Sequence, residues 1–295
     1  MRKLRRQTRV SLSKYLYILP LIVLVLFVYV YPLIRTIIFS FYKIPFGQAV
    51  GEFIGFENYI NIVNNFEFWI SLRNNFVWAF ANLVIQLSIA TIIAAFLNAE
   101  FKGKNLALSA VLLPWIIPTV AVASVIRWVL LPHLGIVNVI LQDLKVIGQP
   151  INFLSSENAM MTLISLSSWR FIPIGVLLVL AAIQTIPKEI YESTRVDGAN
   201  SIQQFFFITY PMVNKMLWFT GFIIFVWNFN ILDLIWLITQ GGPGMVTQTL
   251  PIMVFRTAFR TMRLGESSAI AVIIAGILVC VGIIYFSLMK KGEKE

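Results

Sequence analysis

Cysteine, histidine and charged residues are all scarce in this chain. Among 295 residues there is one cysteine, Cys280, and one histidine, His133. A single cysteine excludes an intrachain disulfide and a cysteine-based metal site, and one imidazole makes no metal site, so we expect none. Charged residues make up 12% of the chain, about half of what is typical of a soluble protein. This leaves too little polar surface for a soluble fold, and the composition indicates a membrane protein.

Long apolar segments account for most of the chain. Apolar residues make up 59% of it, and the mean hydropathy is +0.84. Since about 20 mostly apolar residues cross the hydrocarbon core as a helix, we predict an all-α, polytopic membrane protein of about six transmembrane helices, forming one domain over residues 1–295. The predicted spans are residues 15–41, 71–97, 106–131, 159–183, 214–239 and 267–289.

Basic residues outnumber acidic residues by 23 to 13 and gather at both ends of the chain. These clusters lie beside apolar runs, which is typical of cytoplasmic anchors at anionic lipid and not of a nucleic-acid surface. An even number of spans places both termini on one side, and the positive-inside tendency makes that side the cytoplasm. Three arginines fall on the outer side and, with Phe255 and Phe259, predict a short amphipathic helix. The residues are Arg2, Lys3, Arg5, Arg6, Arg9, Lys14, Lys290, Lys291 and Lys294 at the ends, and Arg256, Arg260 and Arg263 outside.

The longest cytoplasmic segment in this topology is residues 184–213. Pro187 suits the first turn of a helix, where its missing N–H costs nothing, and Glu189 in that turn interacts favourably with the helix dipole. We predict a helix over Lys188–Val196. Gly198 provides the break because glycine adopts positive φ readily, and a second helix runs from Ser201 toward Pro211.

The spacing within this loop resembles the EAA motif of binding-protein-dependent ABC importer permeases. That motif reads Glu-Ala-Ala, three residues, Gly, nine residues, Ile-x-Leu-Pro. The chain has Glu192-Ser193-Thr194, Gly198 and Ile208-Thr209-Tyr210-Pro211 at these spacings. It departs from the motif at Ser193, Thr194 and Tyr210. The resemblance implies a type I importer permease core, in which this loop couples the spans to a separate ATPase.

By this resemblance, Glu192 would pair with a basic residue of the ATPase and Gly198 would allow the turn. Arg195 and Asp197 are further expected contacts. The residues expected to couple to the ATPase are Glu189, Glu192, Arg195, Asp197, Gly198 and Pro211. A solvated amphipathic loop is the alternative interpretation.

A second signature follows the fifth predicted span. Thr239 is followed by Gly241-Gly242-Pro243-Gly244, which resembles the Thr-x-Gly-Gly-Pro stretch in the first permease type of the maltose-like carbohydrate-uptake family. Leu113-Pro114-Trp115 in the third span is also similar to this group. No Lys-Ser or Lys-Thr follows the glycines, so the stretch is not a nucleotide loop. The resemblance covers almost the whole chain.

Polar residues inside the fourth and fifth spans are candidates for the substrate path, because polar groups inside a membrane usually face a cavity or a partner helix. Trp227 and Asn228 offer an aromatic ring and an amide, the two groups that sugars need. The predicted path comprises Trp227, Asn228, Ser168, Phe171, Asn230, Ser167, Arg170 and Ile231. The alternative is that these polar groups bond to one another across helices, with Arg127 and Asp233 as a further interhelical pair. Arg170 could instead recognise an acidic sugar or a sugar phosphate.

The chain has no Walker A motif, so we expect a transport subunit that is not an enzyme and binds no cofactor, with ATP and Mg held by a partner ATPase. The resemblance implies a second permease subunit, an ATPase dimer, an extracytoplasmic binding protein and a sugar, in a multi-pass protein of the cell membrane in contact with lipid. An ion-coupled secondary transporter or channel is the alternative. Disaccharides, longer oligosaccharides, acidic glycans and glycerol-phosphate compounds all remain open as substrates.

Overall fold

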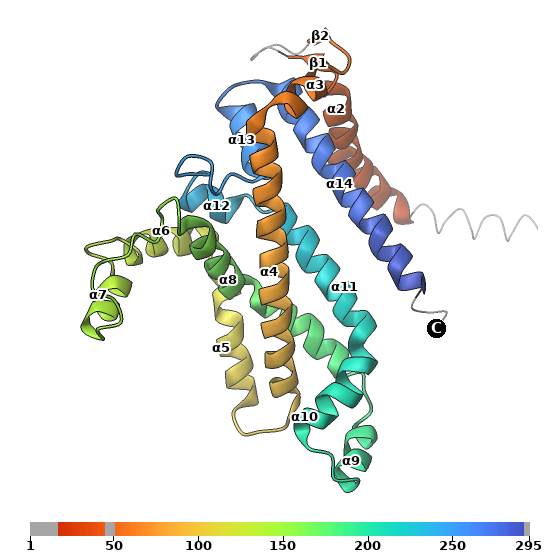
Figure 1. Cartoon of the computed structure of the whole chain (residues 1–295). Coiled ribbons are helices and arrows are strands. Elements are labelled where there is room, and N and C mark those ends of the chain that lie inside the picture. Colours follow the sequence, from red (N-terminus) through yellow and green to blue (C-terminus); the bar gives the residue numbers. More distant parts are fainter. Residues whose placement is uncertain (1–16, 45–50, 292–295) are drawn as a thin grey trace, which may run out of the picture. The chain divides into compact units, whose positions relative to one another are not determined.

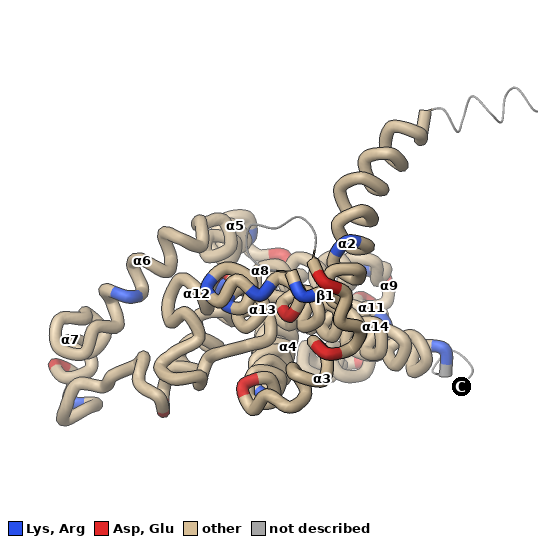
Figure 2. Tube along the Cα trace, turned by 90° about the horizontal axis from the view of Figure 1, so that it is seen from above, with Lys and Arg blue, Asp and Glu red and all other residues tan. Residues whose placement is uncertain are grey.

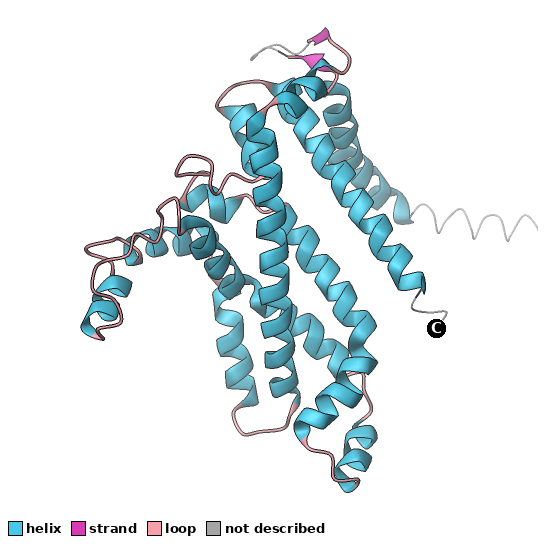
Figure 3. Ribbon diagram, in the orientation of Figure 1, coloured by secondary structure: helices cyan, strands magenta, loops and turns pink. Residues whose placement is uncertain are grey.

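A computed structural model describes residues 17–44 and 51–291, and helices dominate this part of the chain (Figure 3). The basic residues between Arg2 and Lys14, together with Lys294, lie outside the described residues. Two short strands, β1 (Tyr42–Lys43) and β2 (Glu52–Phe53), form an antiparallel pair. The predicted all-α class is therefore confirmed.

The described residues contain five helices that are long and apolar enough to cross a membrane, and a sixth span if a bent helix pair is counted as one. The fourth span is a single helix whose bounds equal the predicted ones. The first span, Tyr17–Phe39, contains a π-helical turn over Leu26–Val30, which is followed by α2 (Tyr31–Phe39). The spans are residues Tyr17–Phe39, α4 (Phe66–Asn98), the pair α5 (Lys104–Ile116) and α6 (Thr119–Val129), α8 (Ala159–Ile183), the run from α10 (Ser201–Gln204) through α11 (Tyr210–Phe229) to α12 (Asp233–Ile238), and α14 (Leu264–Lys291).

The third span is bent, whereas we had predicted one continuous helix over residues 106–131. α5 and α6 meet at an angle of 88°. The bend has a local cause in Ile117 and Pro118, because a proline disfavours helical geometry in the residue before it. Ile117 accordingly has extended dihedral angles, with φ −67° and ψ 130°.

The fifth span also differs from the prediction of one helix over residues 214–239. α11 begins at Tyr210, where Pro211 fits the first turn, and ends at Phe229. A new helix, α12, starts at Asp233, whose carboxylate Oδ1 accepts a hydrogen bond from the backbone N–H of Leu234 at 2.8 Å. Asn230 and Ile231 therefore lie in a break between two helices.

Shorter helices complete the described chain and occupy its connections. A short helix, α13, is present where the amphipathic helix with Phe255 and Phe259 was predicted, and these two rings lie 4.8 Å apart; the helix contains Arg256 but ends at Phe259, before Arg260 and Arg263. The short helices are α3 (Glu57–Asn64), α7 (Ile136–Asp143), α9 (Lys188–Val196) and α13 (Leu250–Phe259). Figure 2 shows that most of the chain carries no charged residue, and that α6 has one basic segment, Arg127.

The chain divides into two compact units, one formed by residues 1–65 and 254–277 and the other by residues 66–253 and 278–295. In the first unit, the Asn58 side-chain amide donates to the backbone oxygens of Ser40 and Tyr42, at 2.8 and 3.1 Å. Gly265 lies directly against the backbone oxygen of Tyr42 in β1, where a Cβ atom would clash. These contacts hold the start of α14 against the end of the first span.

In the second unit, α4, α8 and α11 pack side by side along much of their length (Figure 1). Small residues allow the close approach, because Gly175 of α8 lies directly over Ala90 of α4. Below this point, Val176, Val179 and Leu217 form an apolar core. The residues of the predicted coupling loop and substrate path lie on α8 and α11, on the segment that joins these two helices, and in the break directly after α11.

Candidate functional site

The loop between α8 and α11 folds as the sequence predicted. α9 extends over Lys188–Val196, directly after Pro187, and its C-cap is Asp197. Gly198 follows with φ +84°, in the left-handed region that glycine adopts without strain. Asn200 then caps α10 through a capping box with Gln203, in which each side chain bonds to the other residue's backbone N–H.

One face of α9 is fixed to the helices behind it. Ile190 and Tyr191 pack against the apolar core that contains Ile183 and Val213. The Tyr191 hydroxyl lies 2.9 Å from the hydroxyl of Thr209. These contacts make α9 a rigid extension of α8 and α11.

Thr194 explains one departure from the EAA pattern, where alanine is usual. Its half-buried hydroxyl accepts a hydrogen bond from the Gln204 side-chain amide at 3.1 Å. The same amide donates to the backbone oxygen of Tyr191 at 3.2 Å. Threonine therefore adds a bond between α9 and α10 that alanine would lack.

The other face of α9 points outward and is charged. Glu189, Glu192, Arg195 and Asp197 are exposed, and within the described residues none of them forms an ion pair. Val196 is 88% exposed beside them. An exposed face with unpaired charges and an apolar side chain is available for a partner protein.

Lys188, at the start of α9, forms an ion pair with Glu100, which follows α4. The Lys188 Nζ atom lies 2.6 Å from the Glu100 Oε1 atom, and both side chains are about 80% exposed. The hydrogen bond from Lys188 and its positive charge hold the pKa of the Glu100 carboxyl below its usual value. The same contacts with Glu100 raise the pKa of Lys188.

We expect the Glu100–Lys188 pair to give a small, pH-dependent stabilisation that Glu100→Gln removes. Glu100 contributes above its unfolded pKa, near 4.5, and its contribution is lost as the pH falls through its lowered folded value. Lys188 contributes below its unfolded pKa, near 10.5, and its contribution is lost as the pH rises through its raised folded value. The Tm difference between wild type and Glu100→Gln in detergent should be constant between about pH 5 and 9 and should narrow toward pH 3. A difference that persists at pH 3 would contradict the assignment.

A buried hydrogen-bonded network joins the three long helices nearer their middle. The Asn228 amide nitrogen donates to Gln86 Oε1 at 3.1 Å, and Gln86 Nε2 donates to Asn82 Oδ1 at 3.0 Å. The Ser168 hydroxyl donates to the same Asn82 oxygen at 3.1 Å. All four side chains are at most 2% exposed. The network therefore connects α4, α8 and α11 through side chains that are fully satisfied within the chain.

The eight residues predicted for the substrate path lie in different environments, some buried within the chain and others exposed. Asn228 and Ser168 belong to the buried network and do not face a surface of this chain. Trp227 is 48% exposed, and its ring centroid lies 6.1 Å from that of Phe171. Asn230 is exposed in the break after α11, and Ile231 beside it is buried. Phe171 and Trp227 are thus brought together, at the edge of the network.

The last two predicted residues, Ser167 and Arg170, are buried on α8. Arg170 is 6% exposed, and its guanidinium carbon lies 5.5 Å from the centre of the Phe171 ring. Its Nε and Nη1 atoms have no hydrogen-bond acceptor within the described chain, and neither has the Ser167 hydroxyl a partner.

Sequence reasoning missed Asn82 and Gln86. Both lie in the predicted second span, four residues apart, where they share one face of the helix. Polar residues at this spacing inside an apolar span were the available signal.

Further polar residues of α4 hold the glycine-rich segment after α12. The Asn74 amide donates to the backbone oxygens of Met245 and Gln248, at 2.8 and 3.1 Å. The Gln248 amide donates to the Ser71 hydroxyl at 3.0 Å, and the Asn75 Oδ1 atom accepts from the N–H of Leu250. The residues directly after the Gly-Gly-Pro-Gly stretch are therefore anchored to the second span.

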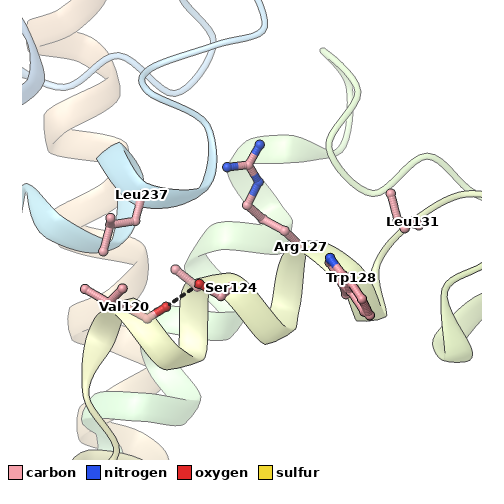
Figure 4. A pocket seen from close by; sticks show the side chains of 7 residues that line it. Val120, Ser124, Arg127, Trp128, Leu131 and Leu237 are labelled. Carbon is pink, nitrogen blue, oxygen red and sulfur yellow. Dashed lines mark hydrogen bonds between the residues drawn. The ribbon is translucent and has the colours of Figure 1, made fainter.

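A groove of about 490 Å³ lies between α6 and α12 (Figure 4). Arg127 and Trp128 project from α6, and Leu237 of α12 lies opposite Val120. The alternative pair of Arg127 and Asp233 is not formed among the described residues, and Asp233 Oδ2 instead accepts a hydrogen bond from the Thr119 hydroxyl at 2.8 Å. Thr119 and Asp233 each begin a helix, which brings them together, whereas Arg127 is two turns further along α6.

Comparison with known proteins places the chain in a defined group. A family model described as "binding-protein-dependent transport system inner membrane component" matches residues 86–291. A probable ABC transporter permease protein of Bacillus subtilis, YurN, is 28% identical over 95% of this chain and 97% of its own. The trehalose/maltose transport system permease protein MalF of Thermococcus litoralis is 29% identical over 92% and 91%.

The comparison with solved structures agrees with the comparison of sequences. A chain from the crystal structure of a bacterial ABC transporter that imports the acidic polysaccharide alginate superposes with a TM-score of 0.85 at 21% identity, covering 98% of this chain and 99% of that one. The predicted permease fold is confirmed. The chain is a multi-pass membrane protein and belongs to the family of inner-membrane components of binding-protein-dependent transport systems.

Proposed function

We propose that this chain is a permease subunit of an ATP-driven sugar importer and forms half of the translocation pore. The family description names transport that depends on a binding protein, which favours this function over an ion-coupled transporter or channel. Relatives are named for trehalose and maltose and for arabinooligosaccharides, and this supports a sugar as the substrate. A second permease, a cytoplasmic ATPase dimer and an extracytoplasmic binding protein would complete the complex, and ATP and Mg would bind to the ATPase.

The outward face of α9 is the observation that carries this proposal. Its four charged side chains form no ion pair with any described residue, while the inward face packs against Ile183 of α8 and is hydrogen-bonded to Gln204 of α10 and to Thr209, just before α11. A partner that pushes on the outward face would move the spans behind it. The loop is therefore suited to transmit force, and Glu192 and Arg195 are the proposed contacts with the ATPase.

The mechanism we propose is a rigid-body movement. The ATPase dimer would close on ATP and shift α9, and the contacts of Tyr191 and Ile190 would carry the shift into α8 and α11. The buried network through Gln86 would make α4 move with them. Access to the pore would then switch between the two sides of the membrane, as a two-state bundle biased by a partner.

The orientation in this proposal places both termini and α9 in the cytoplasm. Lys102, Lys104 and Lys215 then lie on the same side as α9, in agreement with the positive-inside tendency.

Trp227 and Phe171 are the proposed aromatic contacts of the sugar, because an aromatic ring packs well against the apolar face of a sugar. Asn230, exposed beside them, would bond to a hydroxyl.

Glu192→Lys tests the proposal. Reversing the charge in the middle of the outward face should lower sugar uptake and binding-protein-stimulated ATP hydrolysis about tenfold or more, because charge-assisted contacts at an interface contribute about 1.5–3 kcal/mol. Both rates would be measured in proteoliposomes that contain the whole complex.

Glu157→Lys, the same charge reversal at an exposed position before α8, is the control and should leave both rates near those of wild type. Wild-type uptake by Glu192→Lys would refute the assigned role of α9. Isolation of the native complex without an ATPase subunit would refute the function itself.

A further inference from the structure

We infer that Arg170 and Ser167 form a binding site for an oxyanion carried by the transported sugar, so that the importer selects anionic sugars. This inference rests on the proposed function and specifies its substrate class. Its basis is a buried guanidinium that has no acceptor within the described chain.

Arg170 has an unusual environment for a charged side chain. It lies in the middle of α8, a helix that spans the membrane, and is 6% exposed. Its Nε and Nη1 atoms are buried and donate no hydrogen bond within the described residues. A guanidinium remains protonated in proteins, so Arg170 cannot avoid the cost of burial by losing its charge. Leaving these two nitrogens unpaired is costly, which favours an acceptor from outside the chain.

Ser167, on the same face of α8, also has no hydrogen-bond partner within the described chain. It lies three residues before Arg170, so the two side chains are neighbours on the surface of α8. Its hydroxyl is buried and has no partner in the part of the chain that the structure describes, whereas that of the nearby Ser165 donates to the Met161 backbone oxygen at 3.0 Å. Two adjacent donors without acceptors in the described chain can both donate to one group that has several acceptor oxygens.

The carboxylate of Asp233 does not serve as this acceptor. Its Oδ2 atom is bonded to Thr119 and its Oδ1 atom to the N–H of Leu234. Arg170 instead contacts an aromatic ring, Phe171, at 5.5 Å. The positive charge is therefore left for a ligand.

The neighbouring groups favour a sugar as the carrier of the oxyanion. Phe171 pairs with Trp227, whose ring is about half exposed and offers a flat apolar surface. A guanidinium binds carboxylate or phosphate through two parallel hydrogen bonds, and a neutral hydroxyl cannot match this geometry. An aromatic platform beside an unpaired guanidinium fits a uronate or a sugar phosphate better than a neutral sugar.

The test compares charged and neutral forms of the same sugars on the purified complex of both permeases and the ATPase. The probes are the trisaccharides of galacturonate and mannuronate with their carboxyl-reduced forms, and trehalose 6-phosphate with trehalose. Binding is followed by tryptophan fluorescence. At least one anionic probe should bind about 10- to 100-fold more tightly than its neutral form, and Arg170→Gln should abolish that difference. The uronate and phosphate arms distinguish the two sources of the oxyanion.

Two further variants separate recognition from structure. Arg170→Lys keeps the charge without the paired geometry and should retain an intermediate preference. Arg127→Gln removes the same charge from the exposed groove of α6 and should retain the full preference. The inference is overturned if neutral forms bind as well as anionic ones, or if Arg170→Gln weakens all probes equally and releases the second permease. If the wild-type complex takes up none of the sugars in the presence of ATP, the proposed function itself is refuted.

Discussion

Gly175→Ala is expected to destabilise the chain by about 1–3 kcal/mol, and Gly175→Leu to prevent it from folding. The cause is the close packing of α8 on α4. A Cβ atom at position 175 would lie 2.9 Å from Ala90 Cβ, which is too close, so α4 would have to move, whereas its distance of 3.5 Å from Ile224 Cδ1 is an ordinary contact. The same movement would break the network of Gln86 and Asn228, which lies one turn away. Thermal unfolding in detergent and the yield of monodisperse protein are the measurements.

Gly276 provides the matched control for this prediction. It also lies inside a membrane helix, α14, but nothing is within 4 Å of the position of its Cβ atom. Alanine is favoured over glycine in a helix by about 1 kcal/mol, so Gly276→Ala should be neutral or slightly stabilising. The two substitutions are chemically identical and should have opposite signs. Equal effects would show that helix propensity, and not packing, dominates at position 175.

Local signals account for the parts of the fold that the sequence predicted well. Pro187 and Gly198 act on the dihedral angles of a few residues, and α9 begins and ends where they indicate. The bounds of α8 follow from a long apolar run between polar turns. In these places the fold follows from backbone chemistry within one or two turns.

The bend between α5 and α6 was also a local feature, and it was missed. Pro118 lies inside an apolar run that is long enough for one helix, and total hydropathy dominated the prediction. The dihedral restriction that a proline places on the preceding residue applies inside a membrane as it does in water. An Ile-Pro pair in the middle of a predicted span should therefore be interpreted as a break.

The polar network could not be predicted, because it depends on which helices touch. Asn82 and Gln86 are separated from Asn228 by about half of the chain, and the apolar pattern of α4 does not distinguish its neighbours. Polar side chains in membrane helices either bond to each other or face a cavity, and the sequence alone left both alternatives open. In the structure, Asn228 and Ser168 bond within the chain. Their direct contact with substrate remains a prediction.

Arg170 differs from Asn228 and Ser168, because the structure gives its buried nitrogens Nε and Nη1 no partner within the described chain. The sequence showed a charge inside a span, and the structure adds that this charge is buried and has no acceptor in the described chain. Burial is decisive, because an exposed arginine such as Arg127 can reach water or lipid headgroups along its flexible stem. A function for Arg170 thus follows from packing that only the assembled helices reveal.

Gly198→Val is expected to weaken the coupling between the ATPase and the spans, and so to lower both sugar uptake and stimulated ATP hydrolysis, while the spans remain folded. Gly198 has φ +84°, and a residue with a Cβ atom pays about 1–2 kcal/mol in this region, more if it is β-branched. The strain would shift the end of α9 away from the geometry in which Glu192 and Arg195 face outward together. That cost corresponds to a decrease of about 5- to 30-fold in the population with the native turn. Sugar uptake and binding-protein-stimulated ATP hydrolysis in proteoliposomes should fall by a similar factor.

A control at Gly103 shows whether the effect of Gly198→Val on coupling is local or comes from backbone strain in general. It has φ +90° in the turn before α5, with nothing near the position of its Cβ atom, so Gly103→Val introduces the same strain on another turn. Its coupling should stay within about twofold of wild type. Gly198→Asn should be intermediate, since asparagine tolerates the left-handed region better than valine. Equal coupling in Gly198→Val and wild type would mean that the ATPase does not act through the end of α9, and force would then have to enter the spans through another cytoplasmic segment.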